Sequence, residues 1–200
     1  MPTLSVVIPV YNEIKYLERV LARVENARLP EGLERQIVCV DDFSTDGTRD
    51  LLGELAAKKP HLRVLYHEKN QGKGGAIKTG FLEATGDAVI IQDADLEYDP
   101  QDYRSLLQPL VEGEADVVYG SRFSHVDGPV HHYWHRWGNQ LITRFSNWRS
   151  GRTLTDVETC YKLIRRELVQ QIAPKLRELR FGIEIELTHM LARMPGVRFY

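Results

Sequence analysis

Between Leu4 and Tyr119 the sequence alternates short apolar runs with longer amphipathic segments, and this alternation constrains the fold more than any other feature. The apolar runs have the length of buried strands, and the segments between them have the length of helices. Strands joined by helices form a mostly parallel sheet, so we predict an α/β fold with helices on both faces of the sheet. The predicted strands are Leu4–Pro9, Gln36–Val40, Leu62–Tyr66, Ala88–Gln92 and Asp116–Tyr119. The predicted helices are Ile14–Glu25, Thr48–Lys59, Gly74–Thr85 and Asp102–Glu112, the first with Asn12 available as its cap.

The pattern changes after Gly120. Apolar residues within His131–Arg149 lie three or four positions apart, which indicates one face of a helix. These residues are Trp134, Trp137, Leu141, Phe145 and Trp148. We expect this stripe to face the core, although Trp with flanking Arg also suits a membrane interface. Further on we predict a strand at Tyr161–Ile164, helices at Arg166–Ile172 and Gly182–Arg193, and the start of a strand at Val197–Tyr200.

The size and charge of the chain limit its functional class. Its 200 residues fit a single domain, and we expect that domain to continue beyond the last predicted strand. A formal net charge of −2 argues against a nucleic-acid-binding protein that relies on an overall positive field. No apolar run approaches the ~20 residues of a membrane span, so any membrane contact would be peripheral. Cys39 and Cys160 are not spaced as metal ligands, and we interpret both as reduced thiols of a cytosolic protein.

Three acidic residues, Asp93, Asp95 and Glu97, follow the strand predicted at Ala88–Gln92. Alternate residues of an extended chain point to the same side, so the three carboxylates should crowd together. Such crowding is unfavourable unless a cation compensates it. Mg²⁺ and Mn²⁺ prefer oxygen ligands and often bridge carboxylates to phosphate, so this stretch predicts a divalent-metal site. The alternative is a strand followed by a solvated acidic turn.

Polar residues also follow the first two predicted strands, at positions 9–13 and 41–44. In parallel α/β sheets, ligands bind beyond the carboxyl ends of the strands, so we expect a site at this edge. The segment Asn70–Gly75 precedes a helix, and its backbone N–H groups and Lys73 could meet an anion, although a plain turn explains it equally well. The first strand is not followed by GxGxxG, and GxxxxGK[ST] is absent, which disfavours nicotinamide enzymes and P-loop NTPases.

Five motifs in this order resemble family 2 glycosyltransferases, and most closely the dolichol-phosphate mannose synthase group with its bacterial polyprenyl-phosphate glycosyltransferases. The resemblance covers nearly the whole chain and implies a GT-A (Rossmann-like) fold, a nucleotide-sugar donor, a divalent metal and inversion at the anomeric centre. It divides the single domain 1–200 into a nucleotide-binding part at about 1–120 and an acceptor part at about 121–200. The motifs are Val7–Glu13, Val40–Thr48, Asn70–Gly74, Asp93–Asp95 and Gly120–Phe123.

The resemblance also implies roles for single residues. Asp42 would bind the base or ribose, and Asp93 and Asp95 would hold Mg²⁺ or Mn²⁺ against the diphosphate, with Glu97 as a further ligand where that group often has Gln. Phe43 stands where the family more often has a small or polar residue. The remaining residues expected to bind the donor are Pro9, Tyr11, Asn12, Glu13, Val40, Lys73 and Ala94.

The expected chemistry moves a hexose from a GDP- or UDP-sugar to a polyprenyl phosphate at the cytoplasmic face of the membrane. Cleavage of the donor leaves a nucleoside diphosphate whose charge the metal stabilises, which makes Asp95 catalytic. The acceptor phosphate is already anionic and needs cations rather than a strong base. Arg122 and Arg136 are the candidates, because guanidinium groups pair with phosphate oxygens; surface ion pairs are the alternative.

Two other functions fit the sequence. A family 2 enzyme acting on a sugar hydroxyl would need a carboxylate base, for which Asp156 and Glu158 are placed, although we expect Asp156 to be structural or to contact substrate. A non-catalytic module that binds nucleotide sugars is the third possibility.

We interpret His125, His131, His132 and His135 as solvated rather than metal-binding. Glu184 and Glu186 resemble a family segment beside the acceptor, where one of them could position the site, or their charges could simply stabilise a helix start. The sequence does not decide the donor base, the sugar, the lipid or the oligomeric state.

Overall fold

The computed structural model describes residues 2–121 and 133–200, and the side chains of residues 2–121 and 138–200. The strands are β1 (Thr3–Val10), β2 (Glu34–Asp41), β3 (Leu62–Tyr66), β4 (Ala88–Ile91), β5 (Val117–Tyr119) and β6 (Lys162–Arg165). The helices are α1 (Leu17–Asn26), α2 (Thr48–Lys58), α3 (Gly72–Glu83), α4 (Tyr103–Val111), α5 (Tyr133–Ser150), α6 (Arg166–Ile172) and α7 (Ile183–Ala192). Short 3₁₀ turns, Pro100–Asp102 and Ala173–Lys175, precede α4 and follow α6.

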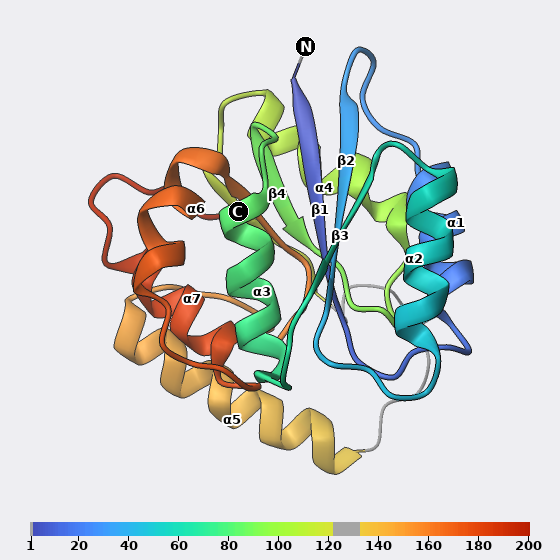
Figure 1. The fold of residues 1–200 in the computed structure, drawn as a ribbon. Helices are drawn as coiled ribbons and strands as arrows, with labels where there is room; N and C mark the ends of the chain where they lie inside the picture. Colours follow the sequence, from blue (N-terminus) through green and yellow to red (C-terminus); the bar gives the residue numbers. More distant parts are fainter. Residues whose placement is uncertain (1, 122–132) are drawn as a thin grey trace.

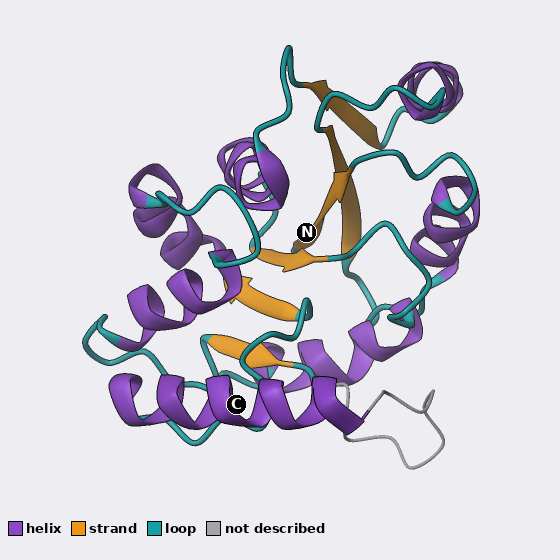
Figure 2. Ribbon diagram, turned by 90° about the horizontal axis from the view of Figure 1, so that it is seen from below, coloured by secondary structure: helices purple, strands orange, loops and turns teal. Residues whose placement is uncertain are grey.

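The strands form one mixed sheet in the order β3-β2-β1-β4-β6-β5. β1 pairs in parallel with β2 and β4, and β2 with β3, whereas β6 runs antiparallel to both β4 and β5. Helices cover both faces of the sheet, with α3 packed on β1 and β2 and α4 packed on β5 and β6 (Figures 1 and 2). The α/β fold with a mostly parallel sheet is therefore confirmed, with β6 as its antiparallel member.

The apolar runs form the core because they lie in the middle of the sheet. Val6, Val7 and Ile8 of β1 are fully buried between the two helical layers, as are Val89 and Ile90 of β4. Strands buried on both faces read as continuous apolar runs, which explains why the sequence pattern located them. Both cysteines are buried and free, as expected.

The first loop differs from the prediction. α1 begins at Leu17 rather than Ile14, and its N-cap residue is Tyr16, with no side-chain cap bond. Asn12 instead has a φ of 57°, and its Oδ1 accepts a hydrogen bond of 2.8 Å from the backbone N–H of Thr45. Its side chain thus joins the loops after β1 and β2, and the expectation that it caps the helix was wrong.

The segment at Val197–Tyr200 forms an isolated parallel bridge, Val117 to Phe199, instead of a full strand. It still lies along β5, since the backbone N–H of Tyr119 donates to the carbonyl of Tyr200 and that of Tyr200 donates to Val117. This segment covers the outer edge of the sheet.

Helix α5 overturns the expectation that its aromatic stripe faces the core. Leu141, Phe145 and Trp148 are 56%, 62% and 77% exposed. Among the described side chains, residues 138–150, the buried face is polar instead and consists of Asn139, Thr143 and Ser146. The side chains of Trp134 and Trp137 lie outside the described part of the structure.

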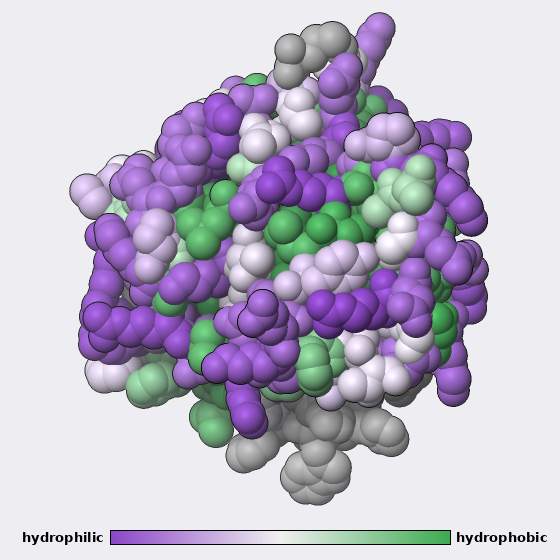
Figure 3. Space-filling model, viewed as in Figure 1, coloured by the Kyte–Doolittle hydropathy of each residue, from purple (hydrophilic) through white to green (hydrophobic). Residues whose placement is uncertain are grey.

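The polar face of α5 is buried because it supplies partners to the loop before β6. The Nδ2 atom of Asn139 donates to Oδ1 of Asp156 at 3.0 Å, and Oγ1 of Thr143 accepts from the backbone N–H of Val157 at 3.2 Å. Buried polar groups need such partners, and this requirement orients the helix more strongly than its apolar residues do. α5 lies beside α7 and runs along the lower edge of the molecule (Figure 1), and hydrophobic residues reach the surface at the lower left of the same view (Figure 3). Within the described residues, the structure contains no helix of the length and hydropathy needed to span a membrane.

Candidate functional site

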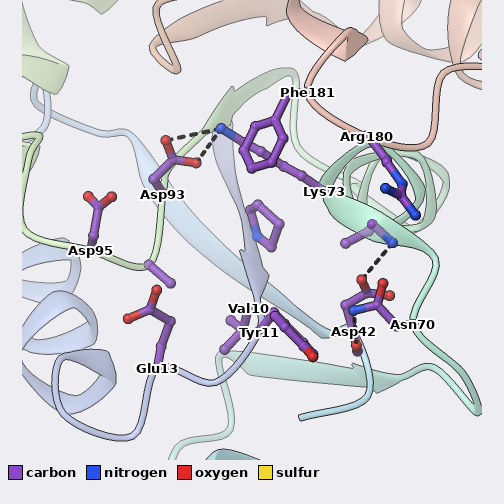
Figure 4. A pocket seen from close by; sticks show the side chains of 14 residues that line it. Val10, Tyr11, Glu13, Asp42, Asn70, Lys73, Asp93, Asp95, Arg180 and Phe181 are labelled. Carbon is purple, nitrogen blue, oxygen red and sulfur yellow. Dashed lines mark hydrogen bonds and ion pairs between the residues drawn. The ribbon is translucent and has the colours of Figure 1, made fainter.

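A cavity of about 560 Å³ opens beyond the carboxyl ends of β1, β2 and β4 (Figure 4). The start of α3 forms another wall, and the segment before α7 contributes Arg180 and Phe181. The volume suits a ligand of nucleotide size. The lining residues are Pro9, Val10, Tyr11, Glu13, Asp42, Asn70, Gly72, Lys73, Ala76, Asp93, Ala94, Asp95, Arg180 and Phe181.

Three carboxylates, those of Asp93, Asp95 and Glu13, lie at one end of this cavity (Figure 4). Burial raises the pKa of Asp95 above its ordinary value, and the charge of Asp93 adds to the rise. Burial likewise raises the pKa of Glu13, with Asp95 as the next cause that raises it. The three groups therefore repel one another, and a bound cation would relieve that repulsion.

Glu97 does not join these acids. β4 ends at Ile91 and the chain bends through residues 94–98, so the alternation of side chains along an extended strand does not continue. The backbone N–H of Glu97 donates to Oδ1 of Asp95 at 2.9 Å, and the Glu97 side chain is exposed and outside the cavity lining. The expectation that strand alternation carries Glu97 to the side of Asp93 and Asp95 was wrong, because a local turn replaces the strand. The charge of Glu97 still adds to the raised pKa of Asp95, and its role as a further metal ligand stays a prediction.

A buried network holds the end of β4. The hydroxyl groups of Tyr103 and Tyr161 both donate to Oε1 of Gln92, at 2.7 and 2.9 Å. The Nε2 atom of Gln92 in turn donates to the carbonyl of Asp93 at 3.0 Å. These bonds position the backbone of the first acid from within the core.

Lys73 reaches Asp93 from α3. Its Nζ atom lies 2.8 Å from Oδ1 of Asp93 and 2.9 Å from Oε1 of Glu184 (Figure 4 shows the pair with Asp93). Burial alone would lower the pKa of Lys73, yet the charges of Asp93 and Glu184 hold it above the ordinary value. Lys73 is therefore a fixed cation at the acidic end of the cavity.

Asp42 lies at the other end of the cavity and fixes the loop before α3. Its Oδ1 accepts from the backbone N–H of Gln71, and its Oδ2 accepts from that of Gly72, both at 2.7 Å. Asn70 adds a bond of 3.2 Å from its Nδ2 to the carbonyl of Asp42. Asp42 thus holds the loop before α3 in place while one edge of its side chain faces the cavity.

Four backbone N–H groups of this loop, those of Gln71, Gly72, Gly74 and Gly75, are already occupied, which the expected anion site did not anticipate. The N–H groups of Gly74 and Gly75 donate to the carbonyl of Leu179, at 2.8 and 3.3 Å, and those of the two preceding loop residues go to Asp42. A Cβ atom at Gly72 or Gly74 would overlap the backbone at residues 178–179, so glycine permits this close packing. Of the predicted anion site, Asn70, Gly72 and Lys73 line the cavity, and Lys73 brings the positive charge.

Most of the residues predicted to bind the donor line the cavity. Pro9, Tyr11, Glu13, Asp42, Lys73 and Asp93–Asp95 line the cavity, whereas Val40 is fully buried within β2 and Asn12 holds the adjacent loop. Arg122 lies outside the described residues, as do His125, His131 and His132, and the side chains of His135 and Arg136 are also outside them. Asp156 is buried against α5, so the structure does not place it at this cavity.

Arg180 and Ala76 line the cavity outside every predicted motif. Phe181 begins the segment of Glu184 and Glu186 that resembled a family segment beside the acceptor, but it was not expected in this cavity. The packing of residues 178–181 on α3 brings Arg180 and Phe181 there. That segment is itself fixed by Glu186, whose carboxylate accepts from the backbone N–H groups of Arg177 and Glu178 at 3.1 and 2.9 Å. Glu186 is thus a loop-positioning residue.

Comparison with known proteins decides the family. The model of the family described as glycosyl transferase family 2 matches residues 5–173. The chain belongs to this family. The GT-A fold expected for this family agrees with the observed strand order and with a cavity at the carboxyl ends of the parallel strands.

Two curated relatives carry related names. The chain is 40% identical over 119 residues to the dolichol-phosphate mannosyltransferase of Pyrococcus furiosus, covering 60% of this chain and 33% of that protein. It is 32% identical over 196 residues to the undecaprenyl-phosphate mannosyltransferase of Micrococcus luteus, covering 94% of this chain and 77% of that protein. The chain thus spans one third of the length of the first relative.

A solved structure shares the fold. The glucosyl-3-phosphoglycerate synthase of Mycobacterium tuberculosis, in complex with Mn²⁺, UDP and glucosyl-3-phosphoglycerate, superposes with a TM-score of 0.64 at 25% identity. The match covers 93% of this chain and 63% of that one. The predicted GT-A glycosyltransferase fold is therefore confirmed.

Proposed function

We propose that this protein transfers a hexose from a nucleotide sugar to a polyprenyl phosphate, with a divalent cation bound by Asp93 and Asp95. The observation that carries the proposal is the cavity itself, which places Asp93 and Asp95 at one end and Lys73 and Arg180 along its walls. The names of the two curated relatives support a polyprenyl-phosphate acceptor. The Mn²⁺ and UDP of the solved glucosyl-3-phosphoglycerate synthase support the cation and the nucleotide.

The residues present fit a cation that arrives with its nucleotide. Within the described residues there is no cluster of three or more acidic, histidine or cysteine side chains arranged around a metal position. Mg²⁺ and Mn²⁺ are commonly held by one or two carboxylates plus phosphate oxygens and water, so Asp93 and Asp95 are a sufficient protein contribution. When bound, the cation would stabilise the charge that develops on the leaving diphosphate.

The side chains of the chain would do the remaining work. Tyr11, 51% exposed at the cavity wall, offers a ring against which a base can pack, and Asp42 lies on the same side. Lys73 and Arg180 would bind oxygens of the diphosphate, because ammonium and guanidinium groups are the usual phosphate donors in proteins. Arg122 and Arg136 stay our candidates for the acceptor phosphate.

A phosphate acceptor fits this site better than a sugar hydroxyl does. A hydroxyl must lose a proton, and sequence reasoning offered two carboxylate bases for this step. Asp156 is 1% exposed and bonded to Asn139, Glu158 is partly exposed, and neither belongs to the cavity lining. An anionic phosphate needs no base and is attracted by the cations named above. Helix α5 supports a lipid-linked acceptor, since its exposed Phe145 and Trp148 lie beside exposed Arg144 and Arg149. Such a face suits peripheral contact with an anionic membrane.

The proposal is tested by nucleotide binding and by transfer. Thermal unfolding is measured with GDP, UDP, GDP-mannose and UDP-glucose, each with and without Mn²⁺, because a ligand that binds the folded state raises the melting temperature. The nucleotide sugar that stabilises the protein is then supplied with undecaprenyl phosphate in vesicles, and glycolipid is measured.

We expect Asp93→Asn and Asp95→Asn each to reduce transfer by about 100-fold or more, as loss of a charged transition-state contact does. Asp50→Asn, an exposed acid on α2, is the matched control and should transfer normally. If no nucleotide shifts the melting temperature, the donor assignment is wrong. If a nucleotide sugar binds with Mn²⁺ but is neither transferred nor hydrolysed, the chain is a binding module.

A further inference from the structure

Lys73 carries one positive charge but contacts two carboxylates, those of Asp93 and Glu184. The Nζ atom of Lys73 is within 2.8 Å of Oδ1 and 3.1 Å of Oδ2 of Asp93, and within 2.9 Å of Oε1 of Glu184. One ammonium group therefore serves two carboxylates, and it contacts the acid proposed to bind the cation. A divalent cation that binds both oxygens of Asp93 competes with Lys73 for the same carboxylate.

Among the described residues, the carboxylate of Glu184 has one oxygen without a recorded hydrogen-bond partner, which is an independent sign that it can accept a further donor. Its side chain comes from the first turn of α7 and the residue is only 5% exposed. Within the described part of the chain, its Oε2 atom is buried and has no hydrogen-bond partner. Buried carboxylate oxygens normally have partners, so Glu184 retains capacity for a further donor. Lys73 has three donor hydrogens and is the nearest cation recorded for this carboxylate.

We propose that Lys73 is a resident counter-cation of Asp93 that moves fully onto Glu184 when a divalent cation and a nucleoside diphosphate bind. This inference rests on the proposed cation site at Asp93 and Asp95. Glu184 is then a positioning residue: it keeps Lys73 at the cavity wall after Asp93 has been given up. In that position the ammonium group faces the diphosphate instead of the acid.

The exchange makes cation and nucleotide depend on each other. A cation arriving alone must displace Lys73 and leave a buried ammonium group with fewer partners. A cation arriving with a diphosphate compensates Lys73 with phosphate oxygens, so each ligand raises the affinity for the other. The protein should therefore bind Mn²⁺ weakly without nucleotide and strongly with it.

The test measures Mn²⁺ binding by electron paramagnetic resonance, without nucleotide and with saturating UDP or GDP. For the wild type we expect the nucleotide to tighten Mn²⁺ binding about tenfold or more, equivalent to about 1.4 kcal/mol. In Lys73→Met, Mn²⁺ alone should bind about tenfold tighter than to the wild type, and nucleotide alone should bind more weakly. These opposite changes in one variant distinguish an exchange from a general loss of structure.

Arg180→Met is the matched control, since it removes one positive charge from the same cavity without removing a recorded partner of Asp93. It should change the affinity for Mn²⁺ alone less than threefold. The role of Glu184 is tested by a double-mutant cycle. Glu184→Gln should weaken the nucleotide's effect on Mn²⁺ binding in the wild type and have no such effect in the Lys73→Met background. The double variant also avoids an unpaired buried carboxylate if Lys73→Met alone folds poorly.

Two results would overturn the inference, and they are distinguishable. If Lys73→Met binds Mn²⁺ alone no better than the wild type, or no better than Arg180→Met, Lys73 does not compete for Asp93, while the proposed function stands. If neither nucleotide promotes Mn²⁺ binding to the wild type, the proposed cation site fails and the inference fails with it.

Discussion

The Nδ1 atom of His67 lies 2.7 Å from Oδ1 of Asp42, and both side chains are buried. On the other side of the ring, Nε2 lies 2.9 Å from Oγ1 of Thr79 on α3. His67 follows β3 and Asp42 follows β2, so this pair links two strand ends to the helix beside the cavity. Through Asp42, it also supports the loop that places Asn70 and Gly72 in the cavity wall.

Replacing His67 by Phe keeps the ring volume and removes both polar contacts. We expect the free energy of unfolding to fall by about 1–3 kcal/mol, because a buried carboxylate oxygen and a hydroxyl lose a partner. Nucleotide affinity should fall several-fold, since the loop before α3 is held less firmly. Urea unfolding and calorimetric titration with UDP or GDP measure the two effects.

His61→Phe is the control, because His61 is largely exposed and its contact with Glu25 is a surface pair. It should change stability by less than about 1 kcal/mol and leave nucleotide binding unchanged. A His67→Phe protein that loses stability but binds nucleotide normally would limit His67 to a structural role.

Tyr161 tests whether the core positions the acids. In Tyr161→Phe, Oε1 of Gln92 keeps the bond from Tyr103 and loses the other, at a cost of about 0.5–1.5 kcal/mol. Because Gln92 also bonds the carbonyl of Asp93, we expect weaker binding of Mn²⁺ with nucleotide. Urea unfolding and Mn²⁺ titration are the measurements.

Tyr16→Phe, at a 42% exposed position, should have neither effect. Normal Mn²⁺ and nucleotide binding by a destabilised Tyr161→Phe would show that the network stabilises the core without positioning Asp93.

Much of the donor side could be predicted because its signals are local. Continuous apolar runs such as Val89–Ile91 mark strands buried on both faces, and parallel strands end at one edge, which brings Asp42 and Asp93 to one cavity. Asp95 reaches the same cavity, although by a turn rather than by strand alternation.

The predictions that were wrong concerned features that depend on contacts between segments far apart in the sequence. The exposed face of α5 follows from the need of Asp156 and Val157 for polar partners, which no helical periodicity displays. The occupied N–H groups at the start of α3 follow from the carbonyl of Leu179, about a hundred residues further along the chain. Arg180 comes to the cavity by that same packing, so its place could not be read from its neighbours in the sequence.

Asp116 provides a pH-dependent test of how the end of the chain is attached. Hydrogen bonds from Arg198 lower the pKa of Asp116 to about 2 and so hold residues 197–200 along β5. A carboxyl group with a lowered pKa in the folded state stabilises the protein above its unfolded pKa of about 4, and that contribution is lost as the pH falls from about 4 to about 2.

Asp116→Asn should therefore cost about 1 kcal/mol at neutral pH, a modest value because Arg198 is exposed to solvent. The difference from the wild type should shrink as the pH falls below about 4 and be small near pH 2. Urea unfolding at several pH values measures it, with Asp50→Asn as an exposed control. A difference that persists unchanged at pH 2 would mean that the charge of Asp116 does not contribute.

The exposed face of α5 presents two aromatic side chains to the solvent. Phe145 and Trp148 pack against each other with ring centroids 5.8 Å apart, yet both are mostly exposed. We expect Phe145→Glu with Trp148→Glu to reduce binding to vesicles of anionic phospholipid by at least about tenfold, because burial of even one such ring contributes about 1.5–3 kcal/mol. The free energy of unfolding should change by less than about 0.5 kcal/mol, since neither ring lies in the core.

Vesicle co-sedimentation measures the binding, and Leu82→Glu is the control. Leu82 is 57% exposed on α3, so its replacement adds a negative charge and removes an apolar group at another surface. If the α5 double variant and the control sediment with vesicles equally well, the apolar face of α5 does not contact the membrane. If the double variant loses vesicle binding but still glycosylates a detergent-solubilised acceptor, the exposed pair of Phe145 and Trp148 acts in membrane contact and not in chemistry.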